Sequence, residues 1–519
     1  MKQYWLILLF TVSISAYAQQ LNLPMGNDYQ LNETNRINEV TNTSFTSCKP
    51  LIECFTNYTF TYSPLFKPRK FVLIEKKITH DHFIHFKNDS IKIVADPIFV
   101  FTQAQDATTS ERFSQNSRGF RIFGNLGKKF SFETSFIENQ TFAPSYIRNF
   151  VASYKVYPGM GRTKEFKVTG FDYASSSGYV SYSPTTWLNI QYGHGKLFIG
   201  NGYRSLLLSD NAFNFPHLKV TYKYKDKLQY TCVTASLMSL QNPERLSVLA
   251  EPLFKKKLAS FHVLAYRPFK RLELTLFEST IYTNNLNTFS AQAFNPIPFS
   301  NALIYGLSNT NNVLVGLNAA YKISSQLLSY GQLMVDDVST KKNSSANRTG
   351  YQLGLYYQNV ANIKHLNVRI EYNQVRPFAY QNESIYQSYS HYNQTLAHPL
   401  QANFKEFVFA GNYNIKNFIF EVRIVSSKIG GDSIGYNSGS LVLQGDGINT
   451  SYTHQTKVSL LQGQVKNLLS QEVSIGYLVN PYNNLMLKLG YFNRVYPGLQ
   501  TQYVYLSASA NLFNQYLDF

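Results

Sequence analysis

Apolar and polar residues alternate in paired runs along most of this chain, and a tight turn joins the two runs of each pair. Residues 178–223 show the pattern clearly, because one alternating run turns at 184–186 and returns as a second alternating run over 187–192. A short turn between two alternating runs indicates an antiparallel β-hairpin. A polar, Gly-rich segment follows, and a new alternating run begins at His217. The repeating unit is therefore strand, tight turn, strand and long loop.

The same unit recurs in about eight hairpins, and a further alternating run lies at each end of the series. The tight turns are predicted near Lys128, Pro184, Asp226, Phe269, Ser324, Asn362, Lys416 and Asn483. Long polar loops are expected at about 139–164, 194–216, 239–257, 281–311, 337–348, 376–403 and 429–468. Short turns at one end and long loops at the other are typical of outer-membrane β-barrels. We therefore predict an all-β, antiparallel outer-membrane β-barrel of about 16 to 18 strands.

The two faces of each predicted strand differ in chemistry. Phe130, Phe132 and Phe136 share one face of the run over 130–136, and Ser and Glu residues share the other. We expect the apolar face to meet lipid and the other face to meet a wet interior, because successive side chains point to opposite sides. A soluble β-sandwich also alternates, but its strands are usually shorter. The 39 Tyr and 39 Phe residues favour the barrel, since they suit strands and interfacial girdles.

The first residues, MKQYWLILLFTVSISAYAQQ, have a positive end, an apolar run and the small-x-small motif Ala16-Tyr17-Ala18. These features predict a secretory signal peptide. The apolar run is too short to span a bilayer with any margin. We expect a signal peptide at 1–18, a small, partly helical N-terminal periplasmic region at 19–90 and the barrel at 91–519, located in the cell outer membrane. The last alternating run precedes Phe519, and an aromatic residue that closes a final strand is typical of such barrels.

The net charge of +18 invites comparison with nucleic-acid-binding proteins. Many of the cations fall at the predicted tight turns, namely Lys128, Lys129, Lys225, Lys227, Lys270, Arg271, Lys364 and Lys416. At one rim of a barrel these side chains would lie near anionic phospholipid headgroups. We therefore expect outer-membrane lipid, and not nucleic acid, as a partner.

The sequence lacks the motifs of the common hydrolase and nucleotide-binding classes, since it has no HExxH, no GxSxG and no phosphate loop. The nearest approach to a metal cluster is His80, Asp81, His82 and His85, for which exposed polar residues are the simpler interpretation. Cys48 and Cys54 are close enough to pair in an oxidising periplasm, but two nearby cysteines also occur by chance. The sequence predicts no catalytic residue, no metal and no cofactor.

Two of the predicted loops carry residues suited to carbohydrate, whose rings stack on aromatic side chains and whose hydroxyls need hydrogen-bonding partners. The candidate polysaccharide-contacting residues are His194, Lys196, Tyr203, Arg204, Arg376, Tyr380, Tyr389 and His391. The alternative is that the loops at 194–216 and 376–403 fold on one another and cap the barrel. The residue pattern favours this alternative over a specific sugar site.

Three segments resemble the RemB-type gliding-motility proteins of Bacteroidota, which are more distantly related to capsule-assembly barrels of the Wzi type. They are RGFRIFGNLGKKFSFETSFIENQ, GYVSYSPTTWLNIQYGHGKLFIGNGYRSLLLSDNAFNFPHLKV and VRPFAYQNESIYQSYSHYNQTLAHPLQANFKE. The resemblance implies a non-enzymatic outer-membrane protein for gliding motility or cell-surface adhesion. It further implies that the protein binds or tethers surface polysaccharide and works with gliding or secretion machinery.

Three other functions remain open. A capsule or exopolysaccharide assembly lectin of the Wzi type is an alternative that the same resemblance implies. A diffusion porin is a second alternative, because a barrel of this size can hold an aqueous path. A barrel hydrolase acting on lipid or lipopolysaccharide is the third, but no Ser and His pair at one height of the outer wall can be picked out of the sequence.

Overall fold

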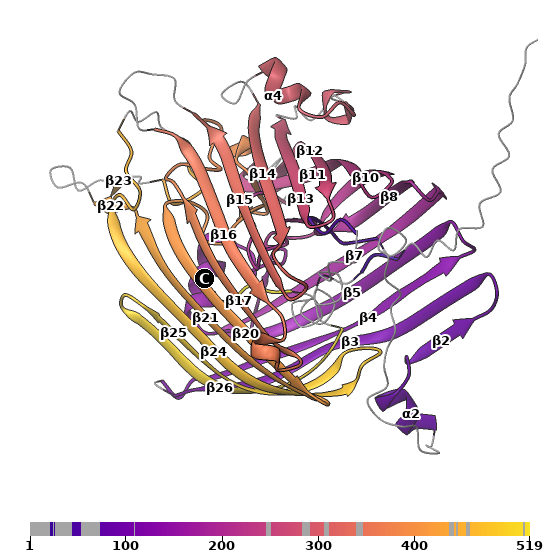
Figure 1. Ribbon diagram of the computed structural model, residues 1–519. Coiled ribbons are helices and arrows are strands. Elements are labelled where there is room, and N and C mark those ends of the chain that lie inside the picture. Colours follow the sequence, from indigo (N-terminus) through magenta and orange to yellow (C-terminus); the bar gives the residue numbers. More distant parts are fainter. Residues whose placement is uncertain are drawn as a thin grey trace, which may run out of the picture.

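The computed structural model describes residues 21–23, 25, 44–52, 73–107, 109–244, 251–282, 291–305, 311–338, 346–434, 441–442, 445–452, 457–511 and 514–519. Over this part the chain forms one closed β-barrel with segments folded inside it (Figure 1). The predicted signal peptide and Cys54 lie outside the described residues, so export and the pairing of Cys48 with Cys54 stay predictions.

Eighteen antiparallel strands close the barrel, which confirms the predicted fold class. In chain order they are β3 (Ile91–Asp106), β4 (Arg112–Leu126), β5 (Phe130–Phe142), β7 (Gly170–Thr185), β8 (Leu188–Gly195), β10 (Phe215–Tyr224), β11 (Leu228–Glu244), β12 (Leu253–Phe269), β13 (Leu272–Tyr282), β14 (Asn312–Lys322), β15 (Leu327–Asp337), β16 (Arg348–Tyr357), β17 (Leu366–Val375), β20 (Phe404–Ile415), β21 (Phe418–Gly431), β24 (Gln464–Asn480), β25 (Leu485–Tyr496) and β26 (Leu499–Ala510). The seam joins β26 to β3, with Tyr503 opposite Asp106 and Ala510 opposite Phe99.

The alternation along the strands separates an outer apolar surface from an inner surface, as predicted. Phe130 is 47% exposed, whereas its neighbour Ser131 is buried. Many outward apolar side chains are similarly exposed around the wall, among them Phe120, Phe136, Leu276, Leu333, Leu353, Phe407, Val473 and Leu506. The surface of a soluble protein does not carry apolar side chains this densely. Such a surface is found where lipid or another protein replaces water.

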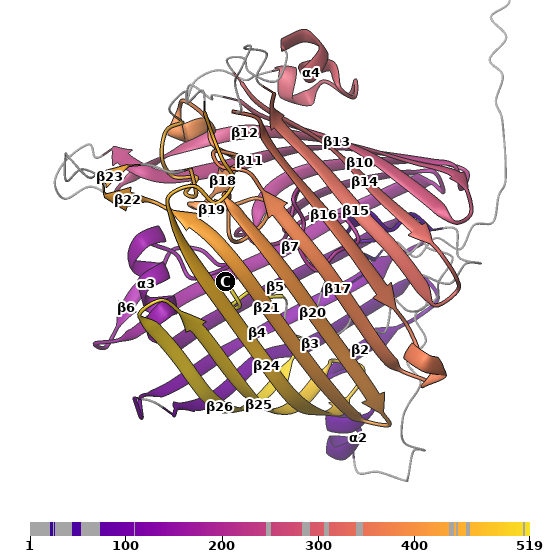
Figure 2. The ribbon, with the colours of Figure 1, turned by 60° about the vertical axis from the view of Figure 1, so that its left-hand side comes forward.

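The predicted tight turns gather at one end of the barrel, which we call the turn end (Figure 2). The predicted cations Lys128, Lys225 and Lys416 lie in these turns. A short helix, α2 (Leu73–Thr79), lies at the same end, where Asn480 Nδ2 donates to the carbonyls of Lys77 and Asp81 at 3.1 and 2.9 Å. The strand β2 (Ile84–Lys87) follows α2 and pairs with β3.

The opposite end, which we call the loop end, departs from prediction at 239–257. This stretch was expected to be a loop, but β11 continues to Glu244 and β12 begins at Leu253. The two strands keep pairing beyond their neighbours, with Ser239 opposite Lys255, and so extend the wall at that point. The loop prediction was wrong because polar residues on a projecting hairpin meet water on both faces and lose their alternation.

The remaining elements are short. They are α3 (Ser145–Tyr154), α4 (Ser300–Tyr305), β6 (Lys164–Phe166), β18 (Ser390–His391), β19 (Gln394–Thr395), β22 (Ser433–Ile434), β23 (Leu441–Val442) and the 3-10 turns η2 (Ala291–Phe294), η3 (Val360–Asn362) and η4 (Ile385–Gln387). Of the helices in the described residues, none has the length and the apolar character needed to cross a bilayer.

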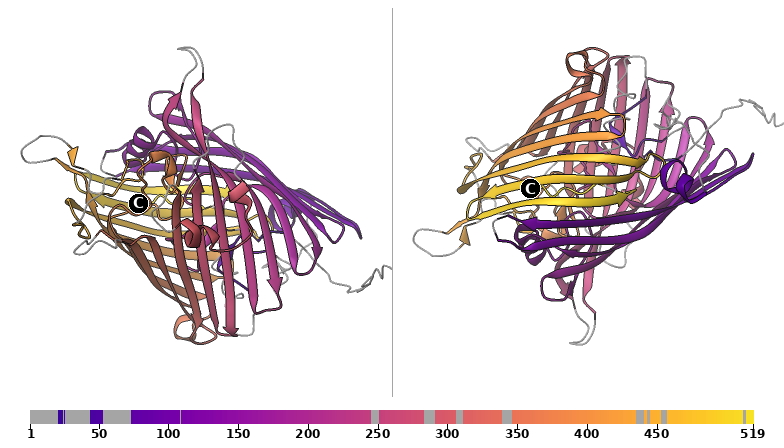
Figure 3. Two further views of the ribbon diagram at one scale, coloured as in Figure 1. Left: turned by 90° about the horizontal axis from the view of Figure 1, so that it is seen from above. Right: turned by 90° about the horizontal axis from the view of Figure 1, so that it is seen from below.

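Phe519 does not close the last strand, contrary to the sequence-based expectation. β26 ends at Ala510, and residues 514–519 turn back into the barrel, so that the end marked C lies within the ring of strands in both end-on views (Figure 3). The Phe519 ring contacts Phe150 of α3, with 5.0 Å between the ring centroids. Residues 514–519, which we call the tail, are therefore part of the barrel interior.

Leu353→Arg should destabilise the folded barrel in lipid vesicles by about 2–4 kcal/mol, because Leu353 lies midway along β16 on the outer face and is 62% exposed. Leu303→Arg is the matched control, since Leu303 is 83% exposed but lies on α4 beyond the strands. Urea unfolding in vesicles should show less than about 0.5 kcal/mol of change for the control. Equal destabilisation by both substitutions would contradict the assignment of the lipid-facing surface.

Candidate functional site

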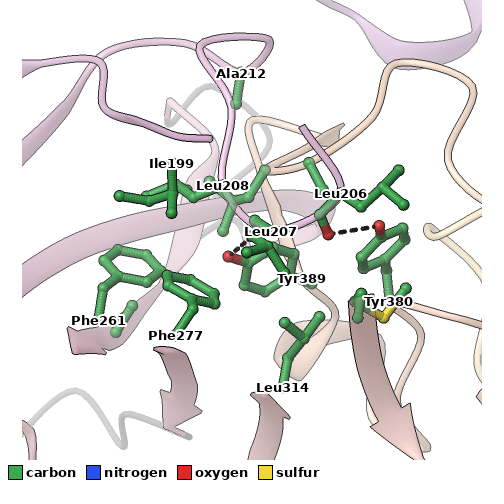
Figure 4. Packing of buried hydrophobic residues seen from close by; sticks show 14 of the residues in the cluster. Ile199, Leu206, Leu207, Leu208, Ala212, Phe261, Phe277, Leu314, Tyr380 and Tyr389 are labelled. Carbon is green, nitrogen blue, oxygen red and sulfur yellow. Dashed lines mark hydrogen bonds between the residues drawn. The ribbon is translucent and has the colours of Figure 1, made fainter. Parts of the chain in front are cut away.

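Residues 196–214, which we call the plug, connect β8 to β10 and fold into the barrel. The predicted loop at 194–216 is therefore not an external loop. Within the plug, β9 (Phe198–Ile199) pairs with β1 (Cys48–Lys49), a described part of the N-terminal region. Leu206, Leu207 and Leu208 at the centre of the plug are fully buried and pack with inward apolar residues of the wall (Figure 4).

Two rows of inward side chains cross the part of the wall that faces the plug. The polar row consists of Thr275, Asn318, Gln332, Gln352, Asn373, Glu406 and Ser427, each directly opposite the next in the strand register. The apolar row lies one step nearer the loop end and consists of Phe277, Gly316, Met334, Gly350, Val375 and Phe404. The side chains of both rows are buried, so this half of the interior is not wet, contrary to prediction.

The plug forms hydrogen bonds with the side chains of Asn318, Gln332 and Gln352 in the polar row. Gln332 Nε2 donates to the Ile199 carbonyl at 2.9 Å, and its Oε1 accepts from the Leu206 N–H at 2.8 Å. Gln352 Nε2 donates to the Arg204 carbonyl at 3.0 Å. Buried amides need such partners, because an unsatisfied one costs about 1–3 kcal/mol. The wall and the plug are therefore complementary in their hydrogen-bonding groups.

Buried charges fix the middle of the plug. Arg204 Nη2 lies 2.8 Å from Asp518 Oδ1 and 3.5 Å from Glu406 Oε1. The carboxylate of Glu371 accepts the main-chain N–H groups of Tyr203 and Arg204 at 2.7 and 3.1 Å. Such a network holds only when each charge is compensated, since removing one partner leaves an unpaired charge in the interior.

The tail completes this network from the other side. Tyr203 Oη donates to Asp518 Oδ2 at 2.8 Å, and Tyr516 Oη donates to Asp210 Oδ1 at 2.8 Å. Burial raises the pKa of the Asp518 carboxyl, but the Arg204 and Arg423 guanidiniums outweigh burial and hold this pKa below its ordinary value. Asp518 therefore stays charged and ties the tail to the plug.

The predicted tyrosines of the second loop also bind the plug. Tyr380 Oη donates to the Leu206 carbonyl at 2.8 Å, and Tyr389 Oη donates to the Leu207 carbonyl at 2.7 Å (Figure 4). Both rings are buried. The loop at 376–403 thus folds on the loop at 194–216, as the alternative prediction stated.

His391 and Arg376 hold the same loop in place. The Met238 N–H donates to His391 Nδ1 at 3.0 Å, so Nε2 carries the ring proton and donates to the Asn214 carbonyl at 3.1 Å. Burial lowers the pKa of His391 to about 3, which keeps the ring neutral. Arg376 donates to the carbonyls of Asn347 and Val458 at 2.9 and 3.1 Å. Contact of these residues with polysaccharide stays a prediction.

The other half of the interior contains a cavity of about 500 Å³. Its wall comes from β3, β4, β5, β7, β8, β10, β21, β24, β25 and β26, and the tail and the plug close the remaining side. His194 and Lys196 are the two predicted loop residues that line it. Lys196 Nζ donates to the carbonyls of Gly159 and Asp210 at 2.8 and 2.9 Å. Burial lowers the pKa of Lys196 to about 8.

Several polar residues of the cavity were not singled out from the sequence. Arg121 and Glu133 form a bidentate ion pair, in which Nε donates to Oε1 and Nη2 donates to Oε2, both at 3.0 Å. Tyr179, Gln191 and His217 lie on neighbouring strands. They occupy inward positions of regular strands, where the sequence pattern predicts only a polar wall. What identifies them is that Glu133, Tyr179 and His217 lie in one row across neighbouring strands beside the plug, and this row is visible only once the pairing of the strands is known.

The interpretation of residues 80–85 as exposed polar residues is wrong for His82, because this side chain is buried. His82 Nδ1 lies 2.7 Å from Asp96 Oδ2, and Lys77 Nζ lies 2.8 Å from Asp81 Oδ2. Across the described ranges, no group of three or more His, Cys, Asp and Glu side chains is placed to hold a metal ion.

A closed barrel with an apolar outer surface, tight turns at one end and a plugged interior defines an outer-membrane β-barrel protein, located in the cell outer membrane. A family model described as capsule assembly protein Wzi matches residues 103–420, which is more than half of the chain. The chain therefore belongs to the Wzi capsule-assembly family.

A solved structure supports the fold. The structure of Wzi, described as an outer-membrane protein involved in group 1 capsule assembly in Escherichia coli and as a carbohydrate-binding β-barrel, matches with a TM-score of 0.56 at 10% identity, covering 95% of this chain and 100% of that one. OprD from Pseudomonas aeruginosa matches at 11% identity over 80% of this chain and 94% of that one, with a TM-score of 0.43, too low to carry an argument. No curated protein matches the sequence.

These findings support the Wzi part of the predicted resemblance. They give no support to the RemB part, and so none to gliding motility or to an origin in Bacteroidota.

Gly202→Ala should loosen the plug, because a Cβ there would lie 2.7 Å from the Arg204 carbonyl oxygen and 2.5 Å from Glu371 Oε2. Single-channel recordings in planar bilayers should show openings that the parent protein lacks. Gly195→Ala is the matched control, since a Cβ at this nearby glycine meets nothing within 4 Å. Identical recordings for the parent and both variants would contradict the tight fit of the plug.

Arg204→Met should lower the free energy of unfolding by about 3–5 kcal/mol, because it removes the guanidinium that the buried carboxylates of Asp518 and Glu406 share. Arg376→Met is the control, because Arg376 donates to the carbonyls of Asn347 and Val458. Urea titration in vesicles should therefore show the larger loss for Arg204→Met. An equal loss in both variants would show that the buried ion pairs do not hold the tail and plug.

Proposed function

We propose that the protein is a non-enzymatic outer-membrane lectin that binds a surface polysaccharide during capsule or exopolysaccharide assembly. Membership of the Wzi capsule-assembly family supports the role in assembly. The carbohydrate part rests on Wzi of Escherichia coli, which has the same fold and is described as carbohydrate-binding. The proposal includes export of the chain, with a signal peptide at 1–18 and a periplasmic region at 19–90.

The plug is the observation that carries the proposal against a diffusion porin. A barrel of 18 strands is wide enough for an aqueous channel. Here the polar wall residues that would line such a channel bond to plug atoms, as Gln332 and Gln352 do. Binding at a fixed interior or outer surface fits this architecture better than the passage of solutes.

Gliding motility and cell-surface adhesion, with gliding or secretion machinery as partners, are a separate proposal that rests on the RemB resemblance alone. The same surface polysaccharide would serve adhesion, so the two proposals share a ligand and differ in the process. Colony spreading separates them, because a capsule lectin has no direct role in movement.

Deletion of the gene should release polysaccharide from the cell surface into the medium while total polysaccharide stays within about twofold, because a lectin affects attachment and not synthesis. Surface-bound and free polysaccharide are measured by sugar analysis of washed cells and culture supernatant. Complementation with the parent chain should restore retention.

Two further measurements, one on the same strains and one on the purified protein, decide between the alternatives. Unchanged retention together with reduced colony spreading would contradict the capsule proposal and favour gliding. Steady ion conductance by the purified parent protein, with no retention of polysaccharide on the immobilised protein, would favour the porin.

A further inference from the structure

The interior cavity has the size and the two-sided lining of a small-molecule site. Its volume of about 500 Å³ falls within the ~300–1,000 Å³ typical of such sites. One side is apolar and aromatic, and it includes Ile98, Val100, Phe113 and Phe492. Polar residues on β5, β7, β8 and β10 line another part of the cavity, among them Glu133, Tyr179, Gln191 and His217.

The polar side is a continuous surface, because its residues are direct neighbours in the strand register. Glu133 lies opposite Tyr179, Tyr179 lies opposite Gly193, and Gly193 lies opposite His217. Gln191 is two residues from Gly193 on the same face of β8. The row thus has a glycine at its centre, where a side chain would otherwise fill the space between Tyr179 and His217.

The charged side chains of this cavity already have partners. Arg121 is paired with Glu133, and Arg423 is paired with Glu472. Lys488 Nζ lies 2.5 Å from Glu421 Oε2. Lys196 is the other cation of this lining, and its Nζ is already bonded to the Gly159 and Asp210 carbonyls. With these groups occupied, the lining suits a neutral ligand better than a phosphate or a uronic acid.

Uncharged groups of the cavity keep unused hydrogen-bonding capacity. Gln191 Oε1, His217 Nε2 and Gln515 Nε2 have no hydrogen-bond partner among the described residues. His217 Nδ1 lies 3.0 Å from the Phe215 carbonyl, so Nδ1 carries the ring proton and Nε2 is an acceptor. Two acceptors on one wall call for a ligand that donates hydroxyl groups.

We propose that this cavity binds one or two sugar rings of a neutral saccharide, with hydroxyls donated to Gln191 and His217 and a ring face packed on the aromatic side. Sugar rings match such a lining because their C–H faces stack on aromatic residues while their hydroxyls bond at the edges. The inference rests on the proposed function, since it assigns an interior subsite to the proposed lectin.

Calorimetric titration of the purified full chain in detergent tests the proposal, with glucose, galactose, mannose, N-acetylglucosamine and maltose as neutral probes and glucuronate as the charged one. At least one neutral probe should bind the parent protein more tightly than glucuronate. Gln191→Leu should weaken that binding about 5- to 10-fold. Gly195→Phe should abolish it, because the space beside Gly195 is open and belongs to the cavity.

Gln103→Leu is the matched control, since Gln103 is exposed and does not line the cavity, and its affinity should equal that of the parent. Heat-modifiable gel mobility establishes that each variant is folded. Neutral sugars that bind the parent and both cavity variants alike would place the sugar site elsewhere and overturn this inference while the proposed function stands. Tighter binding of glucuronate would overturn the neutral class. A parent protein that binds no sugar probe and retains no polysaccharide would overturn the proposed function itself.

Discussion

The hydrogen bonds between the polar row and the plug are the constraint on which the rest of this structure depends. Polar side chains that face inward from β13 to β21 would need water in an open channel. Here three of them, Asn318, Gln332 and Gln352, bond to the plug instead, for example Gln332 through the Leu206 N–H. One step toward the loop end, the apolar row meets the three leucines of the plug. The polar and apolar rows of the wall therefore match the polar and apolar parts of the plug. The cavity lies in the other half of the interior.

The wall of the barrel was predictable because its signal is local. Alternation over about ten residues identifies each strand, and a short turn joins the two strands of each hairpin, so the eight hairpins and the two end strands add up to the observed barrel. Whether a long loop leaves the barrel or folds into it was not predictable in the same way. A loop of polar and Gly residues looks alike in sequence whether it leaves the barrel or enters it, and the partners of Arg204 are hundreds of residues away. Phe519 shows the same limit, because its ring packs inside although its position suggested a strand end.

The candidate residues illustrate why chemistry read from sequence does not fix a role. Tyr380 and Tyr389 were selected because Tyr suits carbohydrate, but a tyrosine hydroxyl suits a buried carbonyl equally well, and here it meets Leu206 and Leu207. His194 and Lys196 do line the cavity, since they lie where β8 ends and the plug begins. Gln191 and His217 were passed over because an inward polar residue on a strand is the default of any such barrel. Only the pairing of the strands distinguishes them from other inward polar residues, because it places Gly193 of β8 between Tyr179 of β7 and His217 of β10.

The seam between β26 and β3 joins the last strand to the first, and the plug is tethered at both ends to neighbouring strands in the middle of the wall. The plug therefore cannot leave the lumen as a separate piece while both strands stay in the wall. The tail follows β26, so its ion pair with Arg204 joins the end of the chain to the plug inside the barrel. Closure of the seam and attachment of the plug thus depend on the same strand.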